Sequence, residues 1–415
     1  MKKIKSMMLY SAMAVFAFTS CDKDDDDDDN TLSCSNQEVM ASDTTASGTQ
    51  IIYKNCNITS NETWSKENIY VLNSRITVTN NATLTIQAGT VIKGAPGAGA
   101  SATALVIARD GKIMANGTAQ DPIIFTSTAD RIEPGETNSP NLKPDNNGLW
   151  GGVIILGEAH ISASAEEVQI EGIPTSDQKG LYGGTNDAHS SGSFTYVSIR
   201  HGGTNIGAGN EINGLTLGGV GAGTVINNIE VVANQDDGIE WFGGSVSVSN
   251  VLIWNCGDDG LDTDQDWTGN CDNFLIVTPQ GGSAFELDGP EGPAATGTHT
   301  FTNGTVYAGA DIDHLVDWDD ETNAALDGVY FYGLAAGYGA TTDFDPFESF
   351  GGDNSGTTQN LQVTLAGGVL ADLFAGTVPG AVSVVAAGTA TVGADASGFG
   401  WTWANESGAL AQIGL

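Results

Sequence analysis

Carboxylates recur at regular positions in the second half of this 415-residue chain, and they are the side chains best placed to do chemistry. Two Asp-Asp-Gly turns, at 236–238 and 258–260, are each followed two residues later by another acid. Ca²⁺ binds about six to eight oxygen ligands in loose geometry, so such a group could hold it. The candidate calcium ligands are Asp236, Asp237, Glu240, Asp258, Asp259, Asp262 and Glu286.

The same turns allow an alternative in which the protein is a glycoside hydrolase. Its catalytic candidates would be Asp236, Asp237, Asp258 and Asp259, because paired acids on neighbouring coils can protonate a leaving oxygen and activate water. This arrangement resembles polygalacturonase-type enzymes, but their acids are followed by His-Gly and Arg-x-Lys. Here the only His-Gly, at 201–202, precedes the acids, and Asp-Asp-Gly also forms simple turns. Lyase chemistry is less favoured still, because Arg200 is the last basic residue that could neutralise a uronate.

The elements that must position these acids are the coils of a repeat. Each unit opens with an asparagine, continues with a short β-branched run and reaches a carboxylate after a turn, with a period of about 22 to 30 residues. The opening residues are Asn228, Asn250, Asn273 and Asn303, with Asp327 starting a fifth unit. A self-similar period of this length indicates stacked coils, and strand-sized runs between Gly, Asn and Asp indicate β-strands. We expect the asparagines at corners with left-handed backbone.

Alternation along each strand predicts which residues face the core. The apolar column Ile239, Leu261, Phe285 and Val316 should point inward, as should Trp241 and Trp318 two residues after its first and last members. The column Glu240, Asp262, Glu286 and Asp317 should point outward, forming a line of like charges about 4.8 Å apart. Trp267, in a loop, is the predicted ligand-binding aromatic residue. The histidines at 160, 189, 201, 299 and 314 show no metal-ligand spacing.

Charge limits the possible partners. The formal net charge is -37, and residues 201–415 contain 28 Asp and Glu but no Lys or Arg. Nucleic acids and anionic membrane surfaces require basic patches, so neither is an expected partner. A cation, a neutral glycan or a basic protein surface is compatible with this composition. Because no Lys or Arg follows residue 200, we expect Ca²⁺ from solution to compensate the acidic column.

The amino-terminal region predicts export and anchoring. Residues 1–20 combine three lysines, a short apolar run and small residues, which is typical of a signal peptide. The FTSC sequence that ends at Cys21 resembles a lipoprotein signal, so we expect Cys21 to be lipidated. The acidic run that follows resembles the tag that directs lipoproteins to the outer face of the outer membrane. It is also a solvated tether.

The organisation expected along the chain has four parts. A signal peptide (1–20) precedes an acidic tether and lead-in (21–60), a parallel β-helix (61–335) and a C-terminal continuation or cap (336–415). Long loops at 131–149 and about 166–192 should leave one side of the helix, marking a binding face. Cys34 and Cys56 could pair in an oxidising compartment, whereas the register separates Cys256 from Cys271 into two buried thiols.

A family resemblance rests on the run YVSIRHGGTNIGAGNEINGLTLGGVGAGT and on NIEVVANQDDGIEWFGG and GDDGLDTDQDWTG. These segments resemble Bacteroidetes-type outer-membrane lipoproteins of uncharacterised activity, which are right-handed, pectate-lyase-like parallel β-helices. The resemblance covers about residues 60–335 and implies an all-β solenoid facing the cell exterior. The expected function is a surface-exposed, lipid-anchored module that binds or scaffolds a glycan or protein. The opposing class is a carbohydrate-active enzyme, a hydrolase rather than a lyase.

Overall fold

The computed structural model describes residues 44–206, 212–277, 281–292, 297–310, 312–319, 321–339, 345–350, 359–374 and 378–415. They belong to one compact unit, 34–415; the other unit, 1–33, lies outside the described residues. The signal peptide, Cys21, the acidic run and Cys34 therefore also lie outside them. No helix among the described residues is long and apolar enough to cross a membrane.

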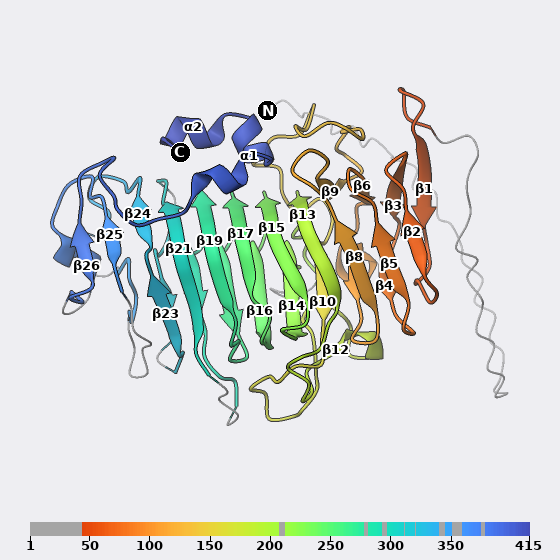
Figure 1. Ribbon diagram of the computed structural model, residues 1–415, viewed down its shortest axis with the longest axis horizontal. Coiled ribbons are helices and arrows are strands. Elements are labelled where there is room, and N and C mark those ends of the chain that lie inside the picture. The colour runs from red at the N-terminus through yellow and green to blue at the C-terminus, as the bar shows by residue number, and fades with distance from the viewer. Residues whose placement is uncertain are drawn as a thin grey trace, which may run out of the picture. The chain divides into compact units, whose positions relative to one another are not determined.

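Two parallel sheets carry almost all of the regular structure (Figure 1). The larger sheet, sheet A, has a main path of β1 (Gln50–Lys54), β3 (Asn68–Leu72), β6 (Val91–Gly94), β9 (Ile123–Ser127), β13 (Gly192–Arg200), β15 (Val225–Val232), β17 (Val248–Trp254), β19 (Asn270–Val277), β21 (His299–Tyr307), β24 (Tyr330–Tyr332), β25 (Leu361–Val363) and β26 (Val382–Val384). Its branch strands are β2 (Glu62–Trp64), β5 (Thr83–Ile86), β8 (Lys112–Asn116) and β23 (Ala324–Asp327).

Sheet B runs in the order β22 (Asp317–Trp318), β20 (Phe285–Leu287), β18 (Leu261–Asp264), β16 (Ile239–Gly244), β14 (Leu215–Val220), β10 (Val153–Leu156), β7 (Ala104–Ile107) and β4 (Arg75–Val78). Successive coils contribute neighbouring strands to both sheets, as in β15 with β17 and β16 with β18. This is the expected right-handed parallel β-helix, with the hand that parallel crossovers adopt.

The long strands of sheet A bend at residues with left-handed backbone. Asn228, Asn250, Asn273 and Asn303 have φ between 54° and 58°, as the asparagine column predicts. The Asn273 amide also donates to the Asn250 side chain at 2.7 Å. The fifth corner is one residue later than expected, because Thr302 pairs with Asp327 and Gly328 therefore takes the left-handed position.

The core lies between the sheets. Ile239, Leu261, Phe285 and Val316 are fully buried, which confirms the inward column. Trp241 and Trp318 are buried as well, as expected. Aromatic rings pack along the coils, for example Phe285 against Phe301 at 5.1 Å between centroids. Stacking of identical positions on consecutive coils thus gives one continuous apolar interior.

The excursion between β10 and β13 covers part of the outer face of sheet B. It contains β11 (Val168–Gln169), the 3-10 turn η2 (Gln178–Gly180) and β12 (Leu181–Tyr182). Ile170 and Tyr182 pack with Leu156 and Phe242 in a second apolar cluster. The loop predicted as a binding face therefore buries much of its own apolar surface against the sheet.

The C-terminal segment covers the side of the helix. Its elements are η4 (Ala396–Phe399), α1 (Trp403–Glu406) and α2 (Ala409–Ile413). Two further 3-10 turns, η1 (Gly99–Ser101) and η3 (Leu370–Leu373), lie earlier in the chain, and Leu373 packs in the main core. Phe399, Trp403 and Leu410 pack on residues of β15, β17 and β19 such as Leu252 and Leu275. In Figure 1, α1 and α2 lie over the ends of these strands. Part of region 336–415 thus continues sheet A as β25 and β26, whereas the final residues lie over strands in the middle of the helix, where outward apolar side chains hold them.

Candidate cation site

The predicted carboxylate column exists, and its members are neighbours in sheet B. Glu240 pairs with Asp262, Asp262 with Glu286, and Glu286 with Asp317. A bridge between Val316 and Phe347 carries the register one coil further, which brings Glu348 next to Asp317. We call these five residues the carboxylate column.

A second row runs beside the column, three residues earlier on each coil. The amide after each turn donates to the carbonyl at the same place on the next coil: Gly238 to Asp259, Gly260 to Ser283 and Ala284 to His314. Asp237, Asp259, Ser283 and His314 therefore stack in what we call the turn row. Within it, the Asp237 carboxylate accepts from the Asp259 amide at 2.9 Å, and that of Asp259 accepts from the Ser283 amide.

Glycine lets the two Asp-Asp-Gly turns pack closely against the neighbouring coils. A Cβ at Gly238 would lie 2.5 Å from the Gly260 carbonyl oxygen and 2.8 Å from the Ile253 side chain, which is too close for any substituent. The same holds at Gly260, where the Ala284 carbonyl oxygen would be 2.8 Å away. The turns thus have a structural role, in addition to placing the aspartates.

Most of the acids are covered, although they point away from the core as alternation predicts. Asp237, Glu240, Asp259 and Asp262 are only 6–7% exposed. The Asn213 amide, which precedes β14, donates to the Glu240 carboxylate. An exposed row of solvated charges is therefore the wrong description of these four residues.

Burial raises the pKa values of these carboxyls. Desolvation is the largest cause for Asp237, Glu240 and Asp262, and the charges of neighbouring acids add to it. Burial, followed by the charge of Asp259, raises the pKa of Glu286 to about 9. Glu240 and Asp262 also hydrogen-bond to each other. Two carboxyls can share such a bond when one holds a proton, and a cation could take the place of that proton.

Two groups of these acids have geometry that suits a divalent ion. Ligand atoms of Asp237, Glu240 and Asp262 all lie within 4.8 Å of one another, and so do those of Asp236, Asp237 and Asp258. Ca²⁺–oxygen distances of about 2.3–2.6 Å allow two ligands of one ion to be up to about 5 Å apart. No Lys, Arg or His in the described ranges forms an ion pair with Asp237, Glu240, Asp259 or Asp262.

The same geometry disfavours glycoside hydrolysis at these acids. Hydrolases hold their two carboxyls about 5 Å or more apart on either side of a sugar. Here the acids of each group are closer than that, and Asp237 and Asp259 are more than nine-tenths buried. This spacing and burial favour cation binding over catalysis.

Arg200 is also unavailable for lyase chemistry. It is completely buried, where its Nη2 atom lies 3.6 Å from Glu230 Oε2 and its guanidinium carbon lies 4.9 Å from the centre of the Trp403 ring. Its Nη1 atom donates to the Thr137 carbonyl at 2.6 Å. Arg200 therefore fastens the C-terminal segment to sheet A and cannot contact a uronate.

The expectation that Trp267 is a ligand-binding residue is wrong. Its side chain is fully buried, stacks on Trp241 with centroids 4.5 Å apart, and donates its indole N–H to the Val246 carbonyl at 2.9 Å. The loop carries it over the edge of β16 into the core, where a large flat ring fills space beside Trp241. Polar neighbours in the sequence gave no sign of this packing.

The cysteines largely follow the predicted pattern. Cys256 and Cys271 are separate buried thiols, as expected. Cys56 is disulfide-bonded, and its expected partner Cys34 lies outside the described residues.

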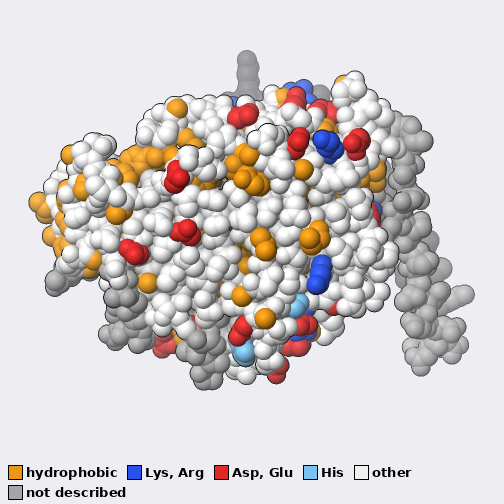
Figure 2. All heavy atoms as spheres, in the orientation of Figure 1, with side chains coloured by type: hydrophobic (Ala, Val, Ile, Leu, Met, Phe, Trp, Pro, Cys, Tyr) orange, Lys and Arg blue, Asp and Glu red, His pale blue; other side chains and the backbone are white. Residues whose placement is uncertain are grey.

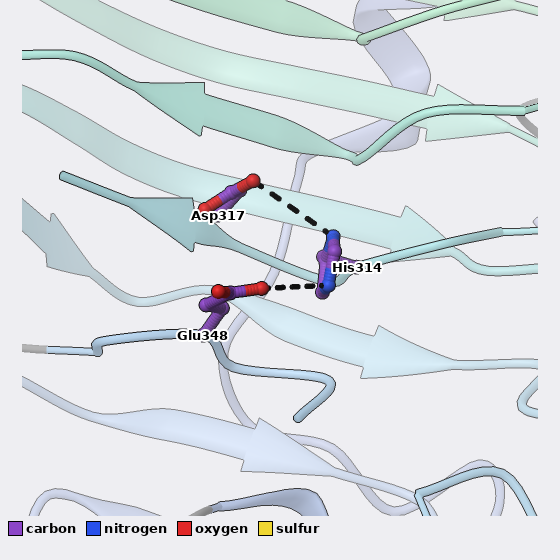
Figure 3. A group of neighbouring side chains, drawn as sticks. All are labelled: His314, Asp317 and Glu348. Atoms are coloured by element: carbon purple, nitrogen blue, oxygen red, sulfur yellow. Dashed lines mark ion pairs between the residues drawn. The ribbon is translucent and has the colours of Figure 1, made fainter. Parts of the chain in front are cut away.

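Sequence reasoning missed one group, at the end of the carboxylate column (Figure 3). His314 lies between two acids: its Nδ1 atom is 3.9 Å from Asp317 Oδ2, and its Nε2 atom is 3.0 Å from Glu348 Oε2. Glu348 comes from the following coil, so residue spacing alone did not reveal the group. The signal that could have found it is the register, which places His314 in the turn row.

Comparison with known proteins agrees with the fold. The family model that matches is described as a pectate-lyase-like beta helix domain, and it covers residues 56–308, more than half of the chain. No curated protein and no solved structure gives a match.

Proposed function

Because the chain belongs to the pectate-lyase-like β-helix family, we propose that it is a lipid-anchored surface module that binds or scaffolds a glycan or protein and is stabilised by Ca²⁺. Membership of this family suggests a surface or carbohydrate-related protein. The observation that carries the calcium proposal is the set of four carboxyls, Asp237, Glu240, Asp259 and Asp262, buried to more than nine-tenths without an ion-pair partner among the described residues.

Calcium suits this set for three reasons. The donors are all oxygen atoms, which a hard cation prefers. Ca²⁺ also accepts water and carbonyl oxygens as ligands, so the acids need not supply its whole coordination sphere. Finally, burying like charges without compensation is costly, so an ion that binds only the folded state shifts the folding equilibrium.

Thermal unfolding of the full chain in chelator and in millimolar Ca²⁺ tests the calcium proposal. We expect the Tm to rise by several degrees with Ca²⁺, because an ion at about 100 times its Kd adds about 2.7 kcal/mol to the free energy of unfolding. The double variant Asp258→Asn with Asp262→Asn should lose this rise.

The matched control is Asp395→Asn, since Asp395 lies outside the carboxylate column and the turn row, and its carboxylate accepts a hydrogen bond from the Ser397 amide. It should keep the full calcium response. An identical Tm for the wild type in chelator and in Ca²⁺ would refute the cation site.

The anchor rests on Cys21, which follows a basic and then apolar segment in the sequence. The proposed location is the outer membrane, facing the cell exterior. Labelled fatty acid should be incorporated into the wild type but not into Cys21→Ser, which should leave the membrane fraction. A wild type that carries no lipid would refute the anchor while leaving the calcium proposal intact.

A glycoside hydrolase remains the alternative function, on the strength of the paired aspartates and the family. Release of reducing sugar from polysaccharides, lost in Asp237→Asn, would favour it.

A further inference from the structure

The turn row changes its chemistry where it reaches the last coils of the carboxylate column. On the coils of β16 and β18, the turn row supplies carboxylates from Asp237 and Asp259. At the corresponding place before β22 it supplies the imidazole of His314. The donor set therefore changes from oxygen alone to oxygen and nitrogen, and imidazole is a ligand of transition metals such as zinc, and not of calcium.

We infer that His314, Asp317 and Glu348 form a separate binding site for a divalent transition-metal ion of the zinc class. One ligand atom from each residue lies within 4.8 Å of the other two. His314 Nε2 and Glu348 Oε2 are 3.0 Å apart. Two ligands of a tetrahedral zinc ion, each about 2.1 Å from it, are about 3.4 Å apart, so a small separation of these side chains admits the ion.

The remaining contacts hold the imidazole in position for such an ion. The second ring nitrogen, Nδ1, faces the Ser283 hydroxyl at 3.5 Å and Asp317 Oδ2 at 3.9 Å. A hydrogen bond at one ring nitrogen orients the other toward a metal. Figure 3 shows Asp317 on the Nδ1 side of the imidazole and Glu348 on the Nε2 side. Asp317 is near enough to be the third ligand, because one ligand atom of each of the three residues lies within 4.8 Å of the others.

Solvent exposure also distinguishes His314, Asp317 and Glu348 from the buried acids. The side chains of His314, Asp317 and Glu348 are 20%, 38% and 49% exposed, whereas the buried carboxyls are 6–7% exposed. An ion from solution can therefore reach the site in the folded protein. Three protein ligands leave positions for water, which is the arrangement of an open metal site.

A chance ion pair of histidine with acids is the competing explanation, and the chain offers a matched control for it. His160 Nδ1 lies 2.8 Å from Asp187 Oδ1, and both side chains are exposed. This pair has no third ligand among the groups of three found in the described residues. His160→Gln should therefore leave metal affinity unchanged.

The test is a calorimetric titration of the full chain with Zn²⁺. Millimolar Ca²⁺ is present, so that calcium can occupy the proposed site at Asp237, Glu240 and Asp262. We expect one Zn²⁺ site, and we expect its affinity to fall at least about 100-fold in His314→Gln and clearly in Glu348→Gln, because even indirect partners of a metal are worth about 10–100-fold. Co²⁺ in place of Zn²⁺ should give visible absorption bands that His314→Gln abolishes. Circular dichroism confirms that each variant is folded.

Three outcomes would overturn the inference. Wild type that binds no Zn²⁺ would show that the three residues form only an ion-paired network. Equal affinity in wild type and His314→Gln would place the ion elsewhere. Zn²⁺ binding lost in Asp258→Asn with Asp262→Asn but kept in His314→Gln would assign the ion to the buried acids. None of these depends on the calcium-induced rise in Tm, so the two proposals can fail separately.

Discussion

Both sheets bury acids on their outer faces, but only sheet A supplies a cation that pairs with its acid. On sheet A, Glu230 is fully buried beneath the C-terminal segment, where Arg200 lies 3.6 Å away and the Ala404 amide donates at 2.9 Å. On sheet B, Glu240 and Asp262 are almost as deeply buried, and their nearest charged neighbours are other acids.

This difference determines whether the buried acids of each face require a counter-charge from solution. On sheet A, the charge of the buried Glu230 is compensated by Arg200 of the same sheet. The face over β13–β21 carries only scattered charged side chains (Figure 2). On sheet B, no Lys, Arg or His of the described residues pairs with Asp237, Glu240, Asp259 or Asp262, so protons or the proposed cation would have to compensate them. Two faces of one solenoid can thus have the same backbone geometry and opposite dependence on ions.

The largest effect is expected on sheet A. Arg200→Met should lower the free energy of unfolding by about 3–5 kcal/mol, because it leaves the buried Glu230 without a charge of opposite sign. The loss should be the same in chelator and in Ca²⁺, measured by urea unfolding. Arg109→Met is the control: its ion pair with Glu167 at 2.6 Å is partly exposed and should be worth at most about 1 kcal/mol. A calcium-dependent loss in Arg200→Met would contradict the separation of the two faces.

The two faces should also respond to pH in opposite directions when no metal is bound. Burial lowers the pKa of His201, which lies under the C-terminal segment, from 6.5 to about 4, so the unfolded state binds the extra proton and stability falls as the pH drops through that window. Glu286 has its pKa raised from 4.5 to about 9, so the unfolded state loses its proton first and stability falls as the pH rises through that window.

Hydrogen exchange in chelator, at pH 5 and at pH 8, can measure the pH response of each face separately. After correction for the intrinsic rates, β15 and α1 should be less protected at pH 5, and β18 and β20 less protected at pH 8. Equal changes on both faces would show that the coils open as one unit.

The smallest effect should come from the corners of sheet A. Asn250→Ala should cost about 1 kcal/mol, because alanine is disfavoured at the φ of 56° that Asn250 adopts. Asn250→Gly should cost less, since glycine accepts this conformation. A larger loss for glycine than for alanine would mean that the side-chain bond from Asn273 matters more than the backbone.

The sequence by itself determined the coil and its register. A β-branched run, an asparagine and an acid recur on each turn of the helix, and alternation assigns Ile253 and Trp241 to the core and Glu240 to the outside. These features depend on neighbours in the same strand or at the same place on the next coil, so they repeat with a period that can be read directly.

Only the tertiary structure decided what lies over each face. The burial of Asp262, the insertion of Trp267 beside Trp241, the docking of Trp403 on sheet A and the meeting of His314 with Glu348 all depend on loops and coils distant in sequence. Such contacts have no period, because each is made once between irregular segments. The direction in which a side chain points was therefore predictable, whereas the medium that it meets, water or protein, was not.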